Sequence, residues 1–301
     1  RPLAGALMIG PGWRKGRPAR RTATPMDQRL DPARPAQASL LAAVAQCVRF
    51  YSRLPLPALP GETQPYAPPG MAALPLALPF AALIIALPSC VVMSICDALG
   101  FPAEITAIVT VAAMLVTTGA FHEDGLADCA DSFGGSTASR RLEIMKDSRV
   151  GTFGAAALGL SLLLRVAALS ALLETRPLFS VAALLLAIAA LSRAAGLTPL
   201  ALIPPARQDG ASFDMGRPSR SGLAVCFLLC AAITGGAVIA ISDWPASLAA
   251  ALVLVAAAAG LATSWVAARK IVGQTGDVAG AAQQIAEMGC LLLPLAATFA
   301  Q

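Results

Sequence analysis

The sequence predicts an all-α integral membrane protein with about seven transmembrane helices, an amphipathic amino-terminal helix and a charged helical loop on the cytoplasmic side. The composition is the first reason: 57% of the residues are hydrophobic and only 13% are charged, whereas a soluble domain carries roughly 25% charged residues. The mean hydropathy of +0.71 is the second. Aromatic residues make up only 5% of the chain, which favours packed helices over the alternating strands of a barrel.

The first 35 residues are predicted to form a disordered tail, because they are rich in Arg, Pro, Gly and Ala and show no apolar period. Residues 36–301 then form one polytopic membrane domain. The chain opens on Arg1, and a start at Met26 would leave a normal-looking protein, so we expect part of the tail to lie upstream of the natural start. Ten of the 22 Lys and Arg residues precede residue 54. A cytoplasmic positive bias explains them better than nucleic-acid binding does.

Residues 39–51 are mildly amphipathic and predict a helix at the membrane surface. A proline-rich stretch at 53–60 ends this helix, because proline removes donors and restricts the preceding residue. Seven segments of about 20 apolar residues follow, the length that a bilayer requires. They lie at about 71–96, 102–121, 153–173, 178–203, 221–241, 246–267 and 280–300.

The loops between these spans predict the orientation. Basic residues gather in three of them, at 140–149, 207–220 and 269–270, while the opposite loops hold only Arg176. The positive-inside rule places the three basic loops and the amino terminus in the cytoplasm and the carboxyl terminus outside. We therefore expect a multi-pass protein of a bacterial cytoplasmic (inner) membrane. Seven scattered cysteines without a C-x-x-C pair predict neither disulfides nor structural zinc.

The stretch 122–154 is a charged island between apolar runs, and it holds the only histidine. Asp124, Asp128 and Asp131 are spaced i, i+4, i+7, so on a helix they share one face within about 60°. Three carboxylates on one stripe repel one another unless a cation lies among them, and oxygen ligands favour Mg²⁺, Mn²⁺ or Ca²⁺. A solvated acidic helix face is the alternative. His122 is a candidate general base or phosphate ligand, or an interfacial residue at the end of a span.

A second set of charged residues follows in the same island. Glu143 and Asp147 are again i, i+4, and Lys146 and Arg149 flank them. Carboxylates that join a metal, beside cations that grip phosphate oxygens, are the apparatus of phosphoryl transfer. Ordinary ion pairing within a helix is the alternative. Further candidates for substrate binding lie elsewhere on the predicted cytoplasmic side or within spans: Arg141, Arg193, Arg207, Asp277 and Glu287.

These residues resemble those of the cobalamin-5′-phosphate synthase (adenosylcobinamide-GDP ribazoletransferase) family. The resemblance covers about residues 47–300 in the right order, and Cys129 and Gln274 are small departures from the usual pattern. The motifs are H-E-D-G-L-A-D-C-A-D (122–131), E-I-M-K-D-S-R-V-G-T-F-G (143–154), R-L-P (53–55), S-R (192–193), P-P-A-R-Q-D-G (204–210) and T-G-D-V-A-G-A (275–281).

The resemblance implies a Mg²⁺-dependent transferase of cobalamin biosynthesis. A hydroxyl of α-ribazole, or of its 5′-phosphate, attacks adenosylcobinamide-GDP, and GMP leaves. On this interpretation Asp124, Asp128, Asp131 and Asp147 hold the metal, and Asp131 or Asp128 doubles as the base. Lys146, Arg149, Arg141 and Arg207 would neutralise phosphate charge, and Asp277 and Glu287 would orient the substrates. Self-association, or association with other corrinoid-pathway enzymes, is also expected.

Two alternatives from other classes remain at this point. The acidic pattern is similar to that of CDP-alcohol phosphotransferases, which is an analogy only. A transporter would explain Arg193 inside a span. Against a transporter, the acidic residues concentrate in one loop, and no internal repeat relates the first spans to the last.

Overall fold

The computed structural model describes residues 39–209, 213, 215–240 and 244–298, and within these ranges the regular elements are all helices. They belong to one compact unit that begins at Ala38. The tail expected at 1–35 lies outside the described residues. The helices are α1 (Leu40–Tyr51), α2 (Leu74–Ala98), α3 (Ala103–Thr118), α4 (Phe121–Ser132), α5 (Ala138–Ile144), α6 (Thr152–Thr175), α7 (Leu178–Leu202), α9 (Arg220–Ala240), α10 (Ser247–Lys270) and α11 (Gly276–Thr298).

The prediction of an all-helical membrane protein is confirmed, with one difference in the spans. Six helices, α2, α6, α7, α9, α10 and α11, are each long and apolar enough to cross a bilayer. The expected second span is shorter: α3 has 16 residues, or about 24 Å at 1.5 Å per residue, against a hydrocarbon core of about 30 Å. It passes as a span only together with α4, from which it is bent by 90°.

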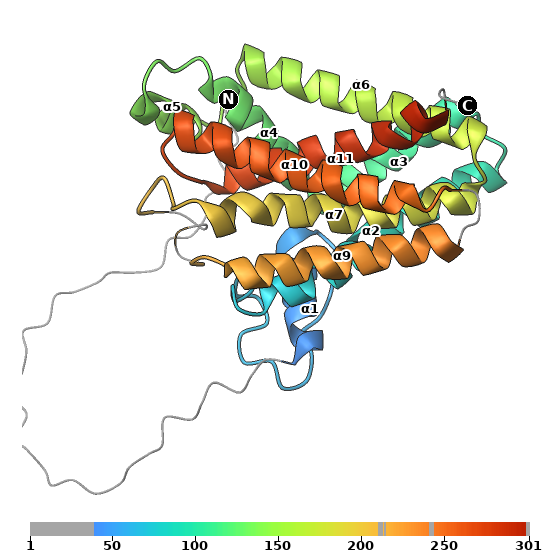
Figure 1. The fold of residues 1–301 in the computed structure, drawn as a ribbon, viewed down its shortest axis with the longest axis horizontal. Coiled ribbons are helices and arrows are strands. Elements are labelled where there is room, and N and C mark those ends of the chain that lie inside the picture. The colour runs from blue at the N-terminus through green and yellow to red at the C-terminus, as the bar shows by residue number, and fades with distance from the viewer. Residues whose placement is uncertain (1–38, 210–212, 214, 241–243, 299–301) are drawn as a thin grey trace, which may run out of the picture. The chain divides into compact units, whose positions relative to one another are not determined.

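Helix α7 lies at the centre of the bundle, in contact with α2, α9, α10 and α11, and Figure 1 shows α9 and α10 running alongside it. Apart from Arg193 and a few hydroxyl residues its sequence is apolar on every side, and a helix of that kind is stable when other helices surround it. Small residues allow a close approach. A Cβ at Gly196 would lie 2.9 Å from the carbonyl oxygen of Ala279 on α11, for example.

The amino-terminal helix α1 is present as predicted, but protein covers its apolar face. Ala43, Val44, Cys47 and Val48 are buried in the main core, and α1 packs on α2. The connector that follows is held by Arg49, whose guanidinium forms a buried ion pair of 2.9 Å with Glu62. The apolar side of α1 therefore packs against α2 and the protein core, whereas a helix lying at the membrane surface would turn that side toward lipid.

The corner between α3 and α4 positions the charged island. Gly119 and Ala120 both adopt left-handed backbone conformations, with φ of 65° and 56°, and these two residues turn the chain through the 90° bend. A Cβ at Gly119 would also lie 2.5 Å from Nε of Arg53, so a larger residue would displace that side chain. The bend ends the apolar helix and directs α4 across the end of the bundle toward α11.

Helices α4 and α11 meet backbone to backbone. A Cβ at Gly125 would lie 2.8 Å from the carbonyl oxygen of Asp277 and 3.2 Å from Cα of Gly280. A Cβ at Gly280 would in turn lie 3.1 Å from the carbonyl oxygen of His122. The glycines on both helices bring the acidic stripe of α4 against the first turn of α11.

Candidate active site

The acidic stripe of α4 and the first turn of α11 form one group of carboxylates. Asp128 is half-buried and lies in the negative field of Asp124, Asp277 and Asp131. Asp124 is exposed to solvent at the edge of this group. Repulsion of this kind is relieved by a cation, and carboxylate oxygens are ligands that suit a hard divalent ion. The structure thus places Asp277, which is about 150 residues away in the chain, with Asp124 and Asp128 of α4.

Arg207 is the cation that the fold brings to this group. The loop after α7 is joined to the loop before α11 by two backbone hydrogen bonds: Ala206 N donates to Gln274 O at 2.9 Å, and Gln274 N donates to Pro204 O at 2.8 Å. This junction sets Arg207 beside Asp277, with 3.6 Å between Nη2 and Oδ2. The site therefore combines three carboxylates with one guanidinium, groups of the kind that can hold a metal ion and a phosphate ester together.

Asp131 has a different structural role from the one expected of it. Its two carboxylate oxygens accept backbone hydrogen bonds from Gly151 N at 2.7 Å and Gly154 N at 2.8 Å. These amides belong to the start of α6, where free N–H groups need an acceptor and the helix dipole favours a negative charge. Asp131 caps α6 from the neighbouring helix. A role for Asp131 as metal ligand and base stays a prediction, since both of its oxygens already accept backbone hydrogen bonds.

Asp147 and Arg149 lie at the surface and bind each other. Arg149 Nη2 lies 2.6 Å from Asp147 Oδ2, and this guanidinium lowers the pKa of Asp147 to about 2. The contacts described for this pair do not reach the carboxylates of α4. A metal-binding role for Asp147 stays a prediction that the geometry of this structure does not support directly.

The other basic residues of the island hold loops together. Lys146 Nζ lies 2.7 Å from Oδ2 of Asp209, and this ammonium lowers the pKa of Asp209 below its ordinary value. Arg141 donates from Nη1 to the carbonyl oxygen of Lys270 at 3.0 Å. Their expected contacts with phosphate therefore remain predictions.

A second set of charged residues lies deeper, inside the bundle. Arg165 of α6 binds Glu123 of α4 at 2.7 Å and Glu287 of α11 at 2.8 Å, and all three side chains are buried. Gln284 extends this network by donating to Glu123 at 3.1 Å, and Gln283 donates to Glu287 at 2.7 Å. Glu287 is thus an interior ion-pair partner, and its expected role in orienting a substrate stays a prediction. The sequence pattern did not identify Glu123 as a functional residue. The available sign was that this charged residue lies next to the end of a predicted span.

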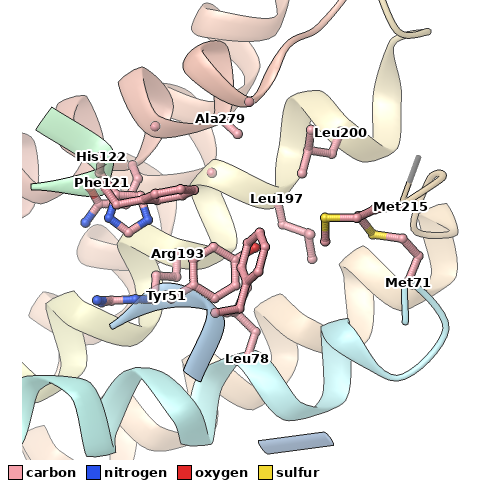
Figure 2. A pocket seen from close by; sticks show the side chains of 15 residues that line it. Tyr51, Met71, Leu78, Phe121, His122, Arg193, Leu197, Leu200, Met215 and Ala279 are labelled. Carbon is pink, nitrogen blue, oxygen red and sulfur yellow. The ribbon is translucent and has the colours of Figure 1, made fainter. Parts of the chain in front are cut away.

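His122 and Arg193 lie on a third side, in an apolar cavity. The imidazole of His122 stacks on the Tyr51 ring, with 6.0 Å between centroids and 8° between planes. Figure 2 shows His122, Tyr51 and Arg193 at one end of this cavity. His122 is about 160° around α4 from Asp124, which directs it away from the carboxylates. A role for His122 as general base or phosphate ligand stays a prediction that this geometry does not support directly.

The carboxylate group is not a finished metal site. Across the ranges that the structure describes, no three acidic, histidine or cysteine side chains converge as a complete set of metal ligands. Mg²⁺ does not need such a cage, because it is commonly held by one or two carboxylates together with substrate phosphates and water. The donor chemistry of Asp124, Asp128 and Asp277 therefore fits Mg²⁺ bound jointly with a diphosphate.

Comparisons with known proteins give one consistent result. A family model described as cobalamin-5-phosphate synthase matches residues 43–295. Proteins named adenosylcobinamide-GDP ribazoletransferase are similar over most of their length. The protein from Azorhizobium caulinodans is 44% identical over 254 residues, 84% of this chain and 95% of the relative. The protein from Xanthobacter autotrophicus is 45% identical over 252 residues, covering 82% and 94%. No solved structure matches the chain.

Proposed function

The chain belongs to the cobalamin-5-phosphate synthase family, and from this premise we propose that it is an adenosylcobinamide-GDP ribazoletransferase assisted by Mg²⁺. The acceptor is α-ribazole or its 5′-phosphate, and the products are adenosylcobalamin, or its 5′-phosphate, and GMP. One observation supports this proposal: three carboxylates, those of Asp124, Asp128 and Asp277, lie together with the guanidinium of Arg207.

The reaction exchanges one phosphorus–oxygen bond for another. A ribazole hydroxyl forms a bond to the phosphorus next to cobinamide, the P–O–P bond to GMP breaks, and the hydroxyl loses its proton. Asp128 suits the acceptor of this proton because it is half-buried among other carboxylates. Asp131 suits it less, because backbone amides engage both of its oxygens.

Charge on the diphosphate is the main obstacle to the attack. Asp124, Asp128 and Asp277 would hold Mg²⁺, which supplies charge neutralisation and orientation when it is bound. Arg207 would contact the departing phosphate, because its guanidinium has a buried Nε with no hydrogen-bond partner among the described residues. Preorganised cationic groups of this kind stabilise the transition state.

The membrane arrangement supports a cytoplasmic site. The basic loops next to α4 and after α7 lie on the same side as the carboxylates, and basic loops face the cytoplasm. We therefore place the amino terminus and the site on the cytoplasmic side of a bacterial inner membrane and the carboxyl terminus outside. This orientation counts α3 as the short second crossing.

The test is GMP release by the purified protein in liposomes supplied with adenosylcobinamide-GDP, α-ribazole and Mg²⁺. We expect release together with a new corrinoid, and EDTA should abolish both. Asp124→Asn and Asp277→Asn should each lower kcat by about 100-fold or more. The matched control is Glu104→Gln, whose carboxylate is exposed in the first turn of α3. Full activity in EDTA would refute the role of the metal, and the absence of GMP release from intact protein would refute the reaction.

A further inference from the structure

The cavity that contains His122 is lined mainly by apolar and aromatic side chains with a few polar groups among them, which is the usual lining of small-molecule sites. It lies between α1, α2, α4, α7 and the first turn of α11. We propose that it binds the base of the nucleoside acceptor, a flat bicyclic aromatic heterocycle with one unsubstituted ring nitrogen. This inference rests on the proposed function and assigns the acceptor half of the site.

An aromatic cluster forms one end of the cavity. The rings of Phe50, Tyr51 and Phe121 meet edge to face, with centroids 4.8 to 5.9 Å apart. His122 contacts both Tyr51 and Phe121, at 6.0 Å and 5.3 Å. Rings arranged in this way present faces and edges that attract a further aromatic ring.

The opposite end is apolar and deformable. Met71 and Met215 face each other there, beside Leu200 and Leu197, as Figure 2 shows. Methionine side chains adapt to the shape of a ligand and make favourable sulfur–aromatic contacts. The cavity as a whole therefore suits a flat, largely apolar group.

Arg193 supplies a buried polar anchor. Its side chain is only 7% exposed, and its charge acts on both His122 and Tyr51. Nη1 donates to the carbonyl oxygen of Ala189 at 3.1 Å, whereas Nε has no hydrogen-bond partner in the described part of the chain. A buried donor without an acceptor is unfavourable, so a ligand that brings one acceptor is stabilised here.

The polar groups of the cavity favour a base with one acceptor over guanine. No acidic side chain occurs among the described lining residues, so the N–H groups of guanine would lack strong acceptors. Gln283 is already committed: its amide nitrogen donates to Ser192 and Glu287, and its oxygen accepts from Gln284. A benzimidazole base, by contrast, brings one free ring nitrogen, an acceptor for the unpartnered Nε–H of Arg193.

The position of the cavity connects it to the reacting groups. Phe121, Asp124 and Asp128 are spaced i, i+3, i+7, so the Phe121 ring lies one turn along the same stripe of α4 as the carboxylates. On α11, Gly276 lines the cavity and Asp277 is the next residue. A Cβ at Gly276 would contact nothing within 4 Å. A ribose attached to a base in the cavity would therefore extend toward Asp124 and Asp277.

The first test combines a substrate change with a protein change. The wild type is assayed with α-ribazole and with the matching indole riboside, in which C–H replaces the free ring nitrogen. We expect the KM for the indole riboside to be about tenfold higher, since 1.4 kcal/mol corresponds to a factor of ten. Arg193→Met should raise the KM for α-ribazole about tenfold and remove the discrimination between the two. The KM for adenosylcobinamide-GDP should not change, and equal discrimination in both proteins would overturn the proposal.

A second pair of variants tests the aromatic wall without touching the buried arginine. Phe121 begins α4, and Phe133, the site of the control substitution Phe133→Ala, directly follows the helix. The two rings start from similar exposure, 45% and 50%. We expect Phe121→Ala to raise the KM for α-ribazole about tenfold and Phe133→Ala to leave it unchanged. An equal effect of the two substitutions would count against the cavity.

Equilibrium dialysis with α-ribazole alone separates this inference from the proposed reaction. Binding that Phe121→Ala weakens, in a protein that releases no GMP, would support the cavity while refuting the transferase. GMP release with unchanged acceptor KM in all variants would support the transferase and overturn the cavity assignment.

Discussion

Replacement of Arg165 by methionine tests the buried network most directly. The Arg165 side chain is 1% exposed and holds Glu123 at 2.7 Å and Glu287 at 2.8 Å. Methionine fills similar space but leaves two buried carboxylates without their shared cation. Breaking a buried ion pair by removing one partner destabilises a protein by about 3–5 kcal/mol. Arg193 lies close enough to act electrostatically on both glutamates, so we expect the lower end, about 3 kcal/mol.

The free cysteines provide the assay. Six of the seven, all except Cys129, are buried in the folded protein, so a thiol-reactive dye reports thermal unfolding in detergent. A loss of about 3 kcal/mol should lower Tm by about 6–12 °C, at roughly 2–4 °C per kcal/mol for a chain of this order of size. The control is Arg140→Met, which removes an exposed ion pair and should change stability by less than about 1 kcal/mol.

A compensated variant decides whether unpaired charge is the cause. Arg165→Met combined with Glu123→Gln and Glu287→Gln has no net charge left in the network, and it should recover most of the lost Tm. Neutral polar groups are far less unfavourable in an apolar interior than unpaired carboxylates. If Arg165→Met unfolds at the wild-type temperature, or if the compensated variant is no more stable than the single one, the ion pairs do not stabilise the bundle as argued.

Three further predictions concern the groups that shape the site. Asp131→Asn should destabilise the protein by about 1–2 kcal/mol in the same unfolding assay, because an amide leaves one of the first N–H groups of α6 without an acceptor; unchanged Tm would contradict the capping role. Gly119→Ala should cost about 1 kcal/mol or more, because it combines a positive φ with a contact on Arg53, and Arg53→Ala should relieve part of this loss. Gly125→Ala should push α4 away from the Asp277 backbone, 2.8 Å from the new Cβ, and lower GMP release at least tenfold. Wild-type turnover in that variant would show that the close packing of α4 on α11 is dispensable.

The sequence by itself determined the class of fold, because hydropathy and helical period are local properties. The i, i+4, i+7 spacing of Asp124, Asp128 and Asp131 puts these residues on one face of any regular α-helix, and α4 has that face. The long apolar runs likewise form six helices of sufficient length. The motifs from residue 122 onward also indicated the family, which the comparisons show.

Only the tertiary structure decided which charged groups meet. Arg165 and Glu123 are 42 positions apart, and Gln284 and Glu123 are 161 positions apart, so periodicity along one helix carries no information about either contact. The two left-handed residues at the α3–α4 corner turn His122 into the aromatic cavity while Asp124 and Asp128 face Asp277. Asp131, one turn further along the same stripe, ends at the start of α6 instead. Residues on one face of a helix point in a common direction. Which groups each side chain contacts depends on the helix that packs against its turn.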